Sequence, residues 1–328
     1  LSIGEQQRVE IVRCLLQDVK LLILDEPTSV LTPQEVETLF KTLHLLSDEG
    51  CSILFISHKL DEVRALCDHA TILKSGQVSG HCIPSETTTE ELARLMVGDD
   101  TPLTEDYKKA EGDEAFLSIV DLSHQSDDPF ACTLKNISFE VKAGEILGIA
   151  GVAGNGQEEL LNLISGEDTS AKETVFFAKK AVGNLTPEKR RILGLGFVPE
   201  ERLGRGAVPD MSLQDNGLLT GYQGELTNNG IINTGKVKAF AQNILERFNV
   251  KAAGIHAQAK SLSGGNLQKY IIGREILQDP KLLVCSHPTW GVDIGAAILI
   301  RHELIKLRDE GCAVLVVSED IDELYSIS

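Results

Sequence analysis

The sequence repeats itself over a long range, in one register and without a gap. When Leu1 is placed on Leu262, LSIGEQQRVEIVRCLLQDVKLLILDEPTS lies on LSGGNLQKYIIGREILQDPKLLVCSHPTW. Farther on, LSDEGCSILFISHKLDEV lies on LRDEGCAVLVVSEDIDEL. Roughly half of these positions are identical, and self-similarity of this kind is typical of a duplicated structural unit. The chain therefore carries parts of two copies of one domain.

The register also predicts where the copies begin and end. The first copy runs from residue 1 to residue 97 and the second from residue 116 to residue 328. By this alignment about 145 residues are missing from the front of the first copy and about 30 from the end of the second, so we expect a fragment of a longer protein. Residues 98–115 are polar and charged with no apolar period, which predicts a linker.

Short apolar runs alternate with longer helical patterns in both copies. The runs LLILD, SILFIS, EILGIA, LGFVP, KLLVCS and AVLVVS are typical of strands buried on both faces of a parallel sheet. Helices are expected at 34–48, 158–164, 235–248 and 296–309, and a helical insert at 213–249. This order predicts an α/β fold with mostly parallel, doubly wound sheets.

The charge balance and the cysteines exclude several classes of protein. The net charge is -18, and such an acidic surface repels nucleic acid and anionic lipid. No apolar run is long enough to span a membrane, and we expect no signal peptide. The seven cysteines have neither metal-ligand nor redox spacing, which favours buried free thiols in a reducing compartment.

One glycine-rich segment, GVAGNGQEE, follows a predicted strand and precedes a predicted helix. Its glycines allow a tight turn whose backbone N–H groups face an anion at the helix N-terminus. A full phosphate-binding loop has Lys and then Ser or Thr after the last glycine, where this chain has Gln157 and Glu158. By itself the segment is equally compatible with an ordinary strand–helix turn.

The segment KLLILDEPTS is more specific. A carboxylate at the C-terminal end of a parallel strand can hold Mg²⁺, which assigns Asp25 to the metal. Glu26 beside it can act as the general base toward a water that attacks a γ-phosphate. The alternative is an ordinary acidic strand end, and His58 after the next strand, in FISH, argues against it.

These residues resemble the ATP-binding cassette (ABC) family. LSIGEQQ and LSGGNLQK are similar to its signature motif, LILDEPTS to its Walker B motif and D-loop, and FISHKLDEV to its switch histidine. GVAGNGQ, FVPEERLGRG and LARLMVG resemble the tandem ATPase subunits of bacterial importers for simple sugars and purine nucleosides. The resemblance covers nearly the whole chain apart from the linker and implies two P-loop NTPase domains, the first represented by its C-terminal part.

The resemblance implies that each ATP lies between the P-loop and Walker B of one copy and the signature motif of the other. One site would combine Asp25, Glu26 and His58 with Ser263, Gly264 and Gly265. The other would combine Gly151, Gly154, Asn155, Gly156, Gln157 and Glu158 with Ser2 and Gly4. In the second copy Ser286, His287 and Glu319 replace Asp25, Glu26 and His58, so this site is expected to be degenerate, and His287 is not expected to act as a substitute base.

FVPEERLGRG falls at the Q-loop of the family, with Glu200 where many cassettes have glutamine. The resemblance implies that this loop touches membrane subunits. Arg202 and Arg205 either contact them or form a solvated charge cluster, and Phe130 is a weak candidate for stacking on adenine.

Together these features predict an ATPase subunit that uses ATP and Mg²⁺ at the cytoplasmic face of the membrane. Its expected partners are transmembrane permease subunits and, indirectly, a periplasmic or lipoprotein substrate-binding protein, with no nucleic acid. The fragment alone is expected to be inactive. The alternatives are a soluble twin-cassette ATPase acting on ribosomes or DNA, which generally keeps Lys in both P-loops, and a catalytically silent nucleotide-binding fragment.

Overall fold

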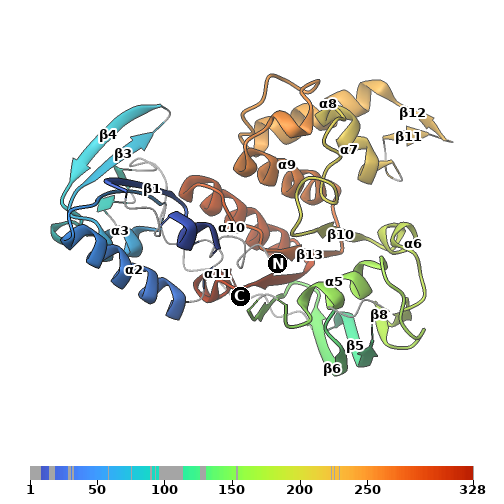
Figure 1. Cartoon of the computed structure of the whole chain (residues 1–328). Helices are drawn as coiled ribbons and strands as arrows, with labels where there is room; N and C mark the ends of the chain where they lie inside the picture. Colours follow the sequence, from blue (N-terminus) through green and yellow to red (C-terminus); the bar gives the residue numbers. More distant parts are fainter. Residues whose placement is uncertain are drawn as a thin grey trace. The chain divides into compact units, whose positions relative to one another are not determined.

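The computed structural model describes residues 9–14, 19–28, 31, 33–57, 59–74, 76–88, 91–92, 94–95, 114–125, 131–152, 154–222, 224, 226–228 and 230–327. The chain divides into two compact units. The first comprises residues up to 105 together with 293–295, and the second the remainder (Figure 1). The expected linker at 98–115 lies mostly outside the described residues, and its last position, Ala115, already begins a strand.

The first unit is built around a parallel pair of strands. Strand β1 (Leu21–Asp25) pairs with β2 (Ser52–Ile56), and helix α2 (Pro33–Asp48) makes the crossover between them. Helix α3 (Leu60–Leu66) follows β2 and precedes the antiparallel strands β3 (Ala70–Lys74) and β4 (Gln77–Cys82) and the short helix η1 (Pro84–Glu86). Among the described residues, the buried core cluster of this unit is small and contains Leu22, Leu24, Leu39 and Leu43.

The other face of this strand pair is apolar and exposed. Leu21 and Ile23 of β1 are 57% and 58% exposed, and Leu54 and Ile56 of β2 are 51% and 44% exposed. The strands therefore alternate between a covered and an uncovered face, although apolar side chains occupy both. An apolar sheet face of this kind is suited to a covering layer.

The second unit contains a four-stranded parallel sheet. Its strands lie in the order β10 (Leu195–Val198), β13 (Leu282–Ser286), β14 (Ala313–Ser318) and β7 (Ile146–Ala150), with neighbours parallel throughout. Both faces are buried. Leu283 and Val314 face one core with helices α8 (Thr234–Arg247), α9 (Gly264–Ile276) and α10 (Ile294–Asp309), while Val284 and Leu315 face another core with α5 (Gln157–Ser165). The near-continuous apolar runs of the sequence are explained by burial on both faces.

The predicted parallel strands and the four predicted helices are all present, whereas the antiparallel pair β3–β4, a small hairpin in the helical insert and one four-stranded sheet were not anticipated. This sheet is antiparallel, with the order β6 (Leu134–Lys142), β5 (Ala115–His124), β8 (Val175–Phe177) and β9 (Lys180–Ala181). Figure 1 shows β5 and β6 in green near α5. Helix α6 (Pro187–Ile192) precedes β10, and α11 (Ile321–Ile327) follows β14.

The expected helical insert consists of two helices and a small hairpin. Helix α7 (Leu213–Gly221) and helix α8 flank strands β11 (Thr227–Asn228) and β12 (Ile231–Ile232). Ser212 and Asn233 cap the two helices by accepting backbone N–H bonds, as small polar residues before a helix usually do. A 3₁₀ turn, η2 (Ala259–Ser261), leads into α9. None of the described helices is both long enough and apolar enough to cross a membrane.

The two copies share their backbone pattern position by position. β1 pairs with β2 with Leu21 opposite Ser52, and β13 pairs with β14 with Leu282 opposite Ala313, which are the equivalent residues of the repeat. Before the second strand of each pair, Gly50 and Gly311 both adopt a positive φ, at 93° and 97°. The structure therefore confirms the sequence repeat.

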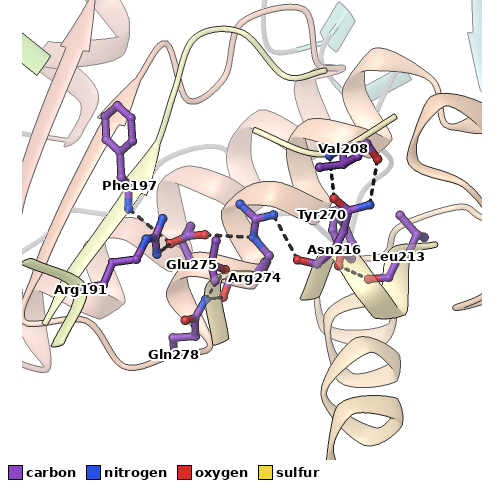
Figure 2. Close-up of polar contacts among 10 residues, drawn as sticks. Arg191, Phe197, Val208, Leu213, Asn216, Tyr270, Arg274, Glu275 and Gln278 are labelled. Atoms are coloured by element: carbon purple, nitrogen blue, oxygen red, sulfur yellow. Dashed lines mark hydrogen bonds and ion pairs between the residues drawn. The ribbon is translucent and has the colours of Figure 1, made fainter. Parts of the chain in front are cut away.

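A buried ionic network ties α9 to the sheet and to α6. The carboxylate of Glu275, which is 1% exposed, accepts bonds from Arg191 at 2.8 Å, from Arg274 at 2.9 Å and from the Phe197 backbone N–H at 3.3 Å (Figure 2). Burial by itself raises the pKa of Glu275, but the charges of Arg191 and Arg274 outweigh it, so this pKa lies below its ordinary value. Glu275 is therefore held ionised at neutral pH.

Candidate functional site

The acidic pair of the first copy stands at the C-terminal end of β1. Asp25 is the last residue of the strand and is exposed, and Glu26 follows with a φ of 47°. The Glu26 N–H donates to the carbonyl of Ile56 at 2.9 Å, which extends the β1–β2 ladder by one bond. A positive φ is unusual for a residue with a side chain and clusters at functional sites. This turn gives the Glu26 carboxylate a fixed starting direction at the strand end.

The second copy keeps the same turn with a different side chain. His287 has a φ of 46°, and its N–H donates to the carbonyl of Val317 at 2.8 Å. The His287 Nδ1 lies 3.0 Å from the Ser286 hydroxyl and 3.9 Å from a carboxylate oxygen of Glu200. The structure thus brings together Glu200, predicted at the Q-loop, and His287, the replacement for Glu26. The backbone of the acidic turn has been retained while its carboxylates have been lost.

Both turns are braced by an identical set of side chains that the sequence reasoning did not identify. In the first copy the Glu62 carboxylate accepts bonds from Thr28 at 2.6 Å and Ser57 at 3.4 Å. In the second copy Glu323 accepts bonds from the hydroxyls of Thr289 and Ser318, the latter at 2.6 Å. The register of the repeat places these three residue types at equivalent positions in both copies, so the sequence alone could have identified them.

The glycine-rich segment forms the turn that a phosphate loop requires. Gly154 and Gly156 have φ values of 81° and 103°, and Gly156 directly precedes α5. These left-handed conformations favour glycine because a side chain would be strained there. The predicted residues Gly151, Gly154, Asn155 and Gly156 lie in the described part of the loop between β7 and α5, and their role in binding phosphate stays a prediction.

The two residues that replace Lys and Ser or Thr are both engaged within the protein. The Gln157 side chain turns back, with its Oε1 accepting the Asn155 N–H at 3.0 Å and its Nε2 donating to the carbonyl of Val152 at 2.9 Å. Glu158 pairs with Arg205 at 3.1 Å. Neither residue presents a free cation or hydroxyl to a triphosphate.

Arg205, which belongs to the FVPEERLGRG segment, contacts side chains of helix α5. In addition to Glu158 it binds the Glu167 carboxylate and the Asn162 side-chain oxygen, the latter at 2.6 Å. Arg202 lies over the ring of Trp290 at 5.4 Å and donates to the Trp290 carbonyl. The alternative of a solvated charge cluster is therefore wrong for Arg202, whereas Arg205 forms a cluster with the exposed carboxylates of Glu158 and Glu167.

The second signature motif opens a long helix. Ser263 precedes α9, which starts at Gly264 and Gly265, and the Ser263 hydroxyl accepts a bond from the Asn266 side chain at 2.9 Å. A Cβ on Gly264 would lie 2.8 Å from a guanidinium nitrogen of Arg202, so a side chain at this position would displace the end of Arg202. The backbone N–H groups at the start of α9 form the kind of end that attracts phosphate.

Four of the predicted residues lie outside the part of the chain that the structure describes. These are Ser2, Gly4, His58 and the adenine candidate Phe130. Among the described residues, no group of three or more His, Cys, Asp or Glu side chains is placed to hold a metal ion. All seven cysteines are free thiols, and burial raises the pKa of Cys312 to about 12.

The donor sets of the two copies differ in how well they fit Mg²⁺. In the second copy, Glu158 stands where a phosphate loop has the Ser or Thr hydroxyl, and it is paired with Arg205. Ser286 stands where the first copy has the Asp25 carboxylate, and it is 2% exposed. This set does not fit the ion, because Mg²⁺ takes carboxylate and hydroxyl oxygens that are free to face it. In the first copy, Asp25 is an exposed carboxylate at a strand end and fits.

Sequence comparison relates the chain to import proteins over its full length. It is 41% identical to a glucose import ATP-binding protein, TsgD13, from Haloferax volcanii over 333 residues, and 40% identical to a nucleoside import ATP-binding protein, NupA, from Lactococcus lactis over 329 residues. All of this chain takes part in each match, and it spans 60% and 65% of the two relatives.

Comparison with solved structures gives the fold. A structure of an archaeal ribosome recycling factor, aABCE1, with the ribosomal stalk protein aP1 matches with a TM-score of 0.69 at 20% identity, over all of this chain and 60% of that one. A dimeric bacterial ABC transporter cassette matches with a TM-score of 0.55 at 22% identity, over 63% of this chain and 89% of that one. These neighbours place the chain in the α/β P-loop NTPase fold of ABC cassettes.

The model of the family described as ABC transporter matches residues 1–29 and 134–290, which include both signature motifs, the acidic turn of the first copy and the phosphate loop of the second. The match takes in more than half of the sequence and contains LSIGEQQ, LILDEPTS, GVAGNGQ, FVPEERLGRG and LSGGNLQK, on which much of the resemblance rested. The chain therefore belongs to the ABC transporter family.

Proposed function

We propose that this chain is part of the ATP-hydrolysing subunit of an importer for simple sugars or nucleosides. The observation that carries the proposal is the full-length similarity to import ATP-binding proteins, at 41% and 40% identity, combined with an acidic turn that is intact in one copy. The expected partners are transmembrane permease subunits and, indirectly, a substrate-binding protein, which would place the chain at the cytoplasmic face of the membrane. We also propose that the first domain ends at residue 97 and that the second begins at residue 116.

Within this function the two copies have unequal roles. Asp25 holds Mg²⁺, which neutralises phosphate charge when bound, and Glu26 accepts the proton of the attacking water. Ser263, Gly264 and Gly265 of the second copy bind the terminal phosphate at the start of α9, and His58 contacts the same phosphate. The second copy's own nucleotide, held by Gly151–Gln157 with Ser2 and Gly4, is not hydrolysed, because Ser286 and His287 replace the two carboxylates.

A soluble ATPase acting on ribosomes is the second candidate, since a ribosome recycling factor has the same fold over the whole chain. Its identity of 20% is about half that of the import proteins. The importer assignment is therefore the better supported of the two. The net charge of -18 also opposes binding to RNA.

The decisive experiment compares two equivalent positions of the repeat. In a longer protein that supplies the P-loop of the first copy, Glu26→Gln is expected to lower steady-state phosphate release by about 10²–10⁴, the usual cost of losing a proton-transfer group. His287→Ala changes the rate by less than about threefold, because no hydrolysis occurs beside it. Equal losses in two folded variants would refute the unequal sites. Rates that rise with ribosomes rather than with permease-containing vesicles would favour the second candidate.

A further inference from the structure

The Gln157 side chain occupies the inside of the glycine-rich loop. Its Oε1 accepts the N–H of Asn155 at 3.0 Å, and its Nε2 donates to the carbonyl of Val152 at 2.9 Å. The Asn155 side chain donates to the same carbonyl, also at 2.9 Å. One side chain thus bridges the loop from within, using both of its polar atoms.

Gly151 shows how closely the side chain fills this space. A Cβ built on Gly151 would lie 2.4 Å from the Gln157 Nε2 and 3.5 Å from its Cδ, and among the described residues no other atom outside its immediate chain neighbours lies within 4 Å. Gly151 does not have a positive φ, so backbone conformation does not require glycine there. A Cβ at position 151 would therefore displace the amide end of the flexible Gln157 side chain.

The bridge uses a group that a phosphate would need. Phosphate loops bind anions through successive backbone N–H groups that converge at the start of a helix. The N–H of Asn155 is one of these, and an oxygen of the chain itself already satisfies it. A phosphate oxygen must therefore replace the Gln157 oxygen before it can use this N–H. The neighbouring Glu158 carboxylate, with a side chain 70% exposed, adds negative charge at the same helix start.

We infer that Gln157 is an internal ligand of the phosphate loop in the second copy, and that its side chain must be displaced before the phosphates of a nucleotide can bind there. Gln157 then determines the nucleotide affinity of this site. The inference rests on the proposed function in one respect: it takes the loop of the second copy as a nucleotide site. The displacement itself concerns only the contacts among Gly151, Val152, Asn155 and Gln157.

The test uses ATP as the probe and this 328-residue chain as the protein. Gln157→Ala removes the internal ligand, while Gly151→Ala keeps Gln157 and expels its side chain through the added Cβ. Both variants are expected to bind ATP about 2- to 10-fold more tightly in calorimetric titration, which is about the range that one neutral hydrogen bond spans. Gln242→Ala, which removes an exposed glutamine that bonds within α8, is the matched control and leaves the affinity unchanged.

A second measurement examines the contact without nucleotide. Hydrogen exchange at the Asn155 amide is expected to be faster in Gln157→Ala and Gly151→Ala than in the wild type and the control. Unchanged exchange, or a Gln157→Ala affinity equal to or weaker than wild type, would overturn the inference alone. Faster exchange in a folded variant that still binds no ATP would overturn the nucleotide site of the proposed function together with the displacement step.

Discussion

The two copies differ in single side chains at the turn after β1 and β13, where their backbones have the same conformation. Glu26 and His287 have φ values of 47° and 46°, and each donates its N–H to the adjacent strand at 2.9 Å or 2.8 Å. The turn therefore does not depend on a carboxylate. Whether the site can move a proton depends on the side chain alone, so one substitution changes the chemistry without rebuilding the fold.

The brace behind each turn is a residue-scale feature that stability measurements can test. Glu323, 2% exposed, accepts bonds from the Thr289 N–H at 3.0 Å and the Ser318 hydroxyl at 2.6 Å. Glu323→Ala is expected to lower the free energy of unfolding by about 1–3 kcal/mol for each buried donor left without a partner. Denaturant unfolding of the second unit measures this, with exposed Glu310→Ala as the control. Equal stabilities would show that the brace contributes nothing.

The lowered pKa of Glu275 predicts how the stability of the second unit responds to acid. Its folded-state pKa lies below the ordinary value, so its contribution to stability is complete above the unfolded pKa of about 4.3 and is lost as the pH falls through the folded value. Glu275→Gln is expected to cost about 3–5 kcal/mol at neutral pH, because Arg191 and Arg274 lose their shared anion.

The same substitution should also flatten the dependence of stability on pH below about 5, where this carboxylate would otherwise take up its proton. Unfolding followed between neutral and acidic pH tests both parts. Glu246→Gln, at an exposed position on α8, is the control and keeps the wild-type profile. A Glu275→Gln profile as steep as wild type would contradict the assignment of the acid response to this network.

At the scale of elements, equivalent strands of the two copies lie in different surroundings. Leu54 of β2 is 51% exposed, whereas its equivalent in β14, Leu315, is fully buried. Leu315 packs in the core that includes α5 and the antiparallel sheet of β5 and β6. The described part of the first unit holds no equivalent of that layer. The strand pair β1–β2 consequently presents the apolar residues Leu21, Ile23, Leu54 and Ile56 to solvent.

This difference gives a prediction with an internal control, since both residues are leucines at one position of the repeat. Leu315→Ala is expected to lower the free energy of unfolding of the second unit by about 2–5 kcal/mol through lost burial and a cavity. Leu54→Ala is expected to stay within about 0.5 kcal/mol for the first unit, as surface substitutions usually do. Domain-resolved hydrogen exchange measures both, and a large loss for Leu54→Ala would mean that its face is covered in solution.

At the scale of the whole molecule, the question is which signature motif serves which nucleotide. Ser2 and Ser263 are the same residue of the repeat, and Ser2 is the closer in sequence to Asp25 and Glu26. Under the proposed function, Ser263 nevertheless serves the hydrolysing site. In a longer protein with a complete first copy, Ser263→Ala is then expected to lower ATP hydrolysis about 10- to 100-fold, the cost of one hydrogen bond to a charged phosphate.

Ser2→Ala should mainly weaken nucleotide retention at the silent site, with a turnover near that of the wild type. Steady-state phosphate release and retained nucleotide, measured on both variants, separate the two roles. A strong loss for Ser2→Ala with normal turnover for Ser263→Ala would reverse the assignment and give each copy its own signature motif.

The sequence by itself determined the duplication, the α/β class and the inequality of the two acidic turns. These follow from local properties: apolar runs report burial of strands, and the gapless register makes every residue of one copy comparable with its equivalent. For this reason the strands from LLILD to AVLVVS and the four helices were predicted correctly. The antiparallel sheets were missed, and in the largest of them the pairing of β5 with β8 joins segments more than 50 residues apart.

The tertiary structure alone decided where the polar side chains point. Sequence comparison identified Gln157 as a replacement for lysine, but only the folded loop directs its amide onto Asn155 and Val152. Likewise, the placement of Arg202 on Trp290 and of Arg205 on Glu158 joins elements that are distant in the chain. A side chain with several possible partners is committed to one of them by packing, and packing is a property of the assembled chain rather than of any local segment.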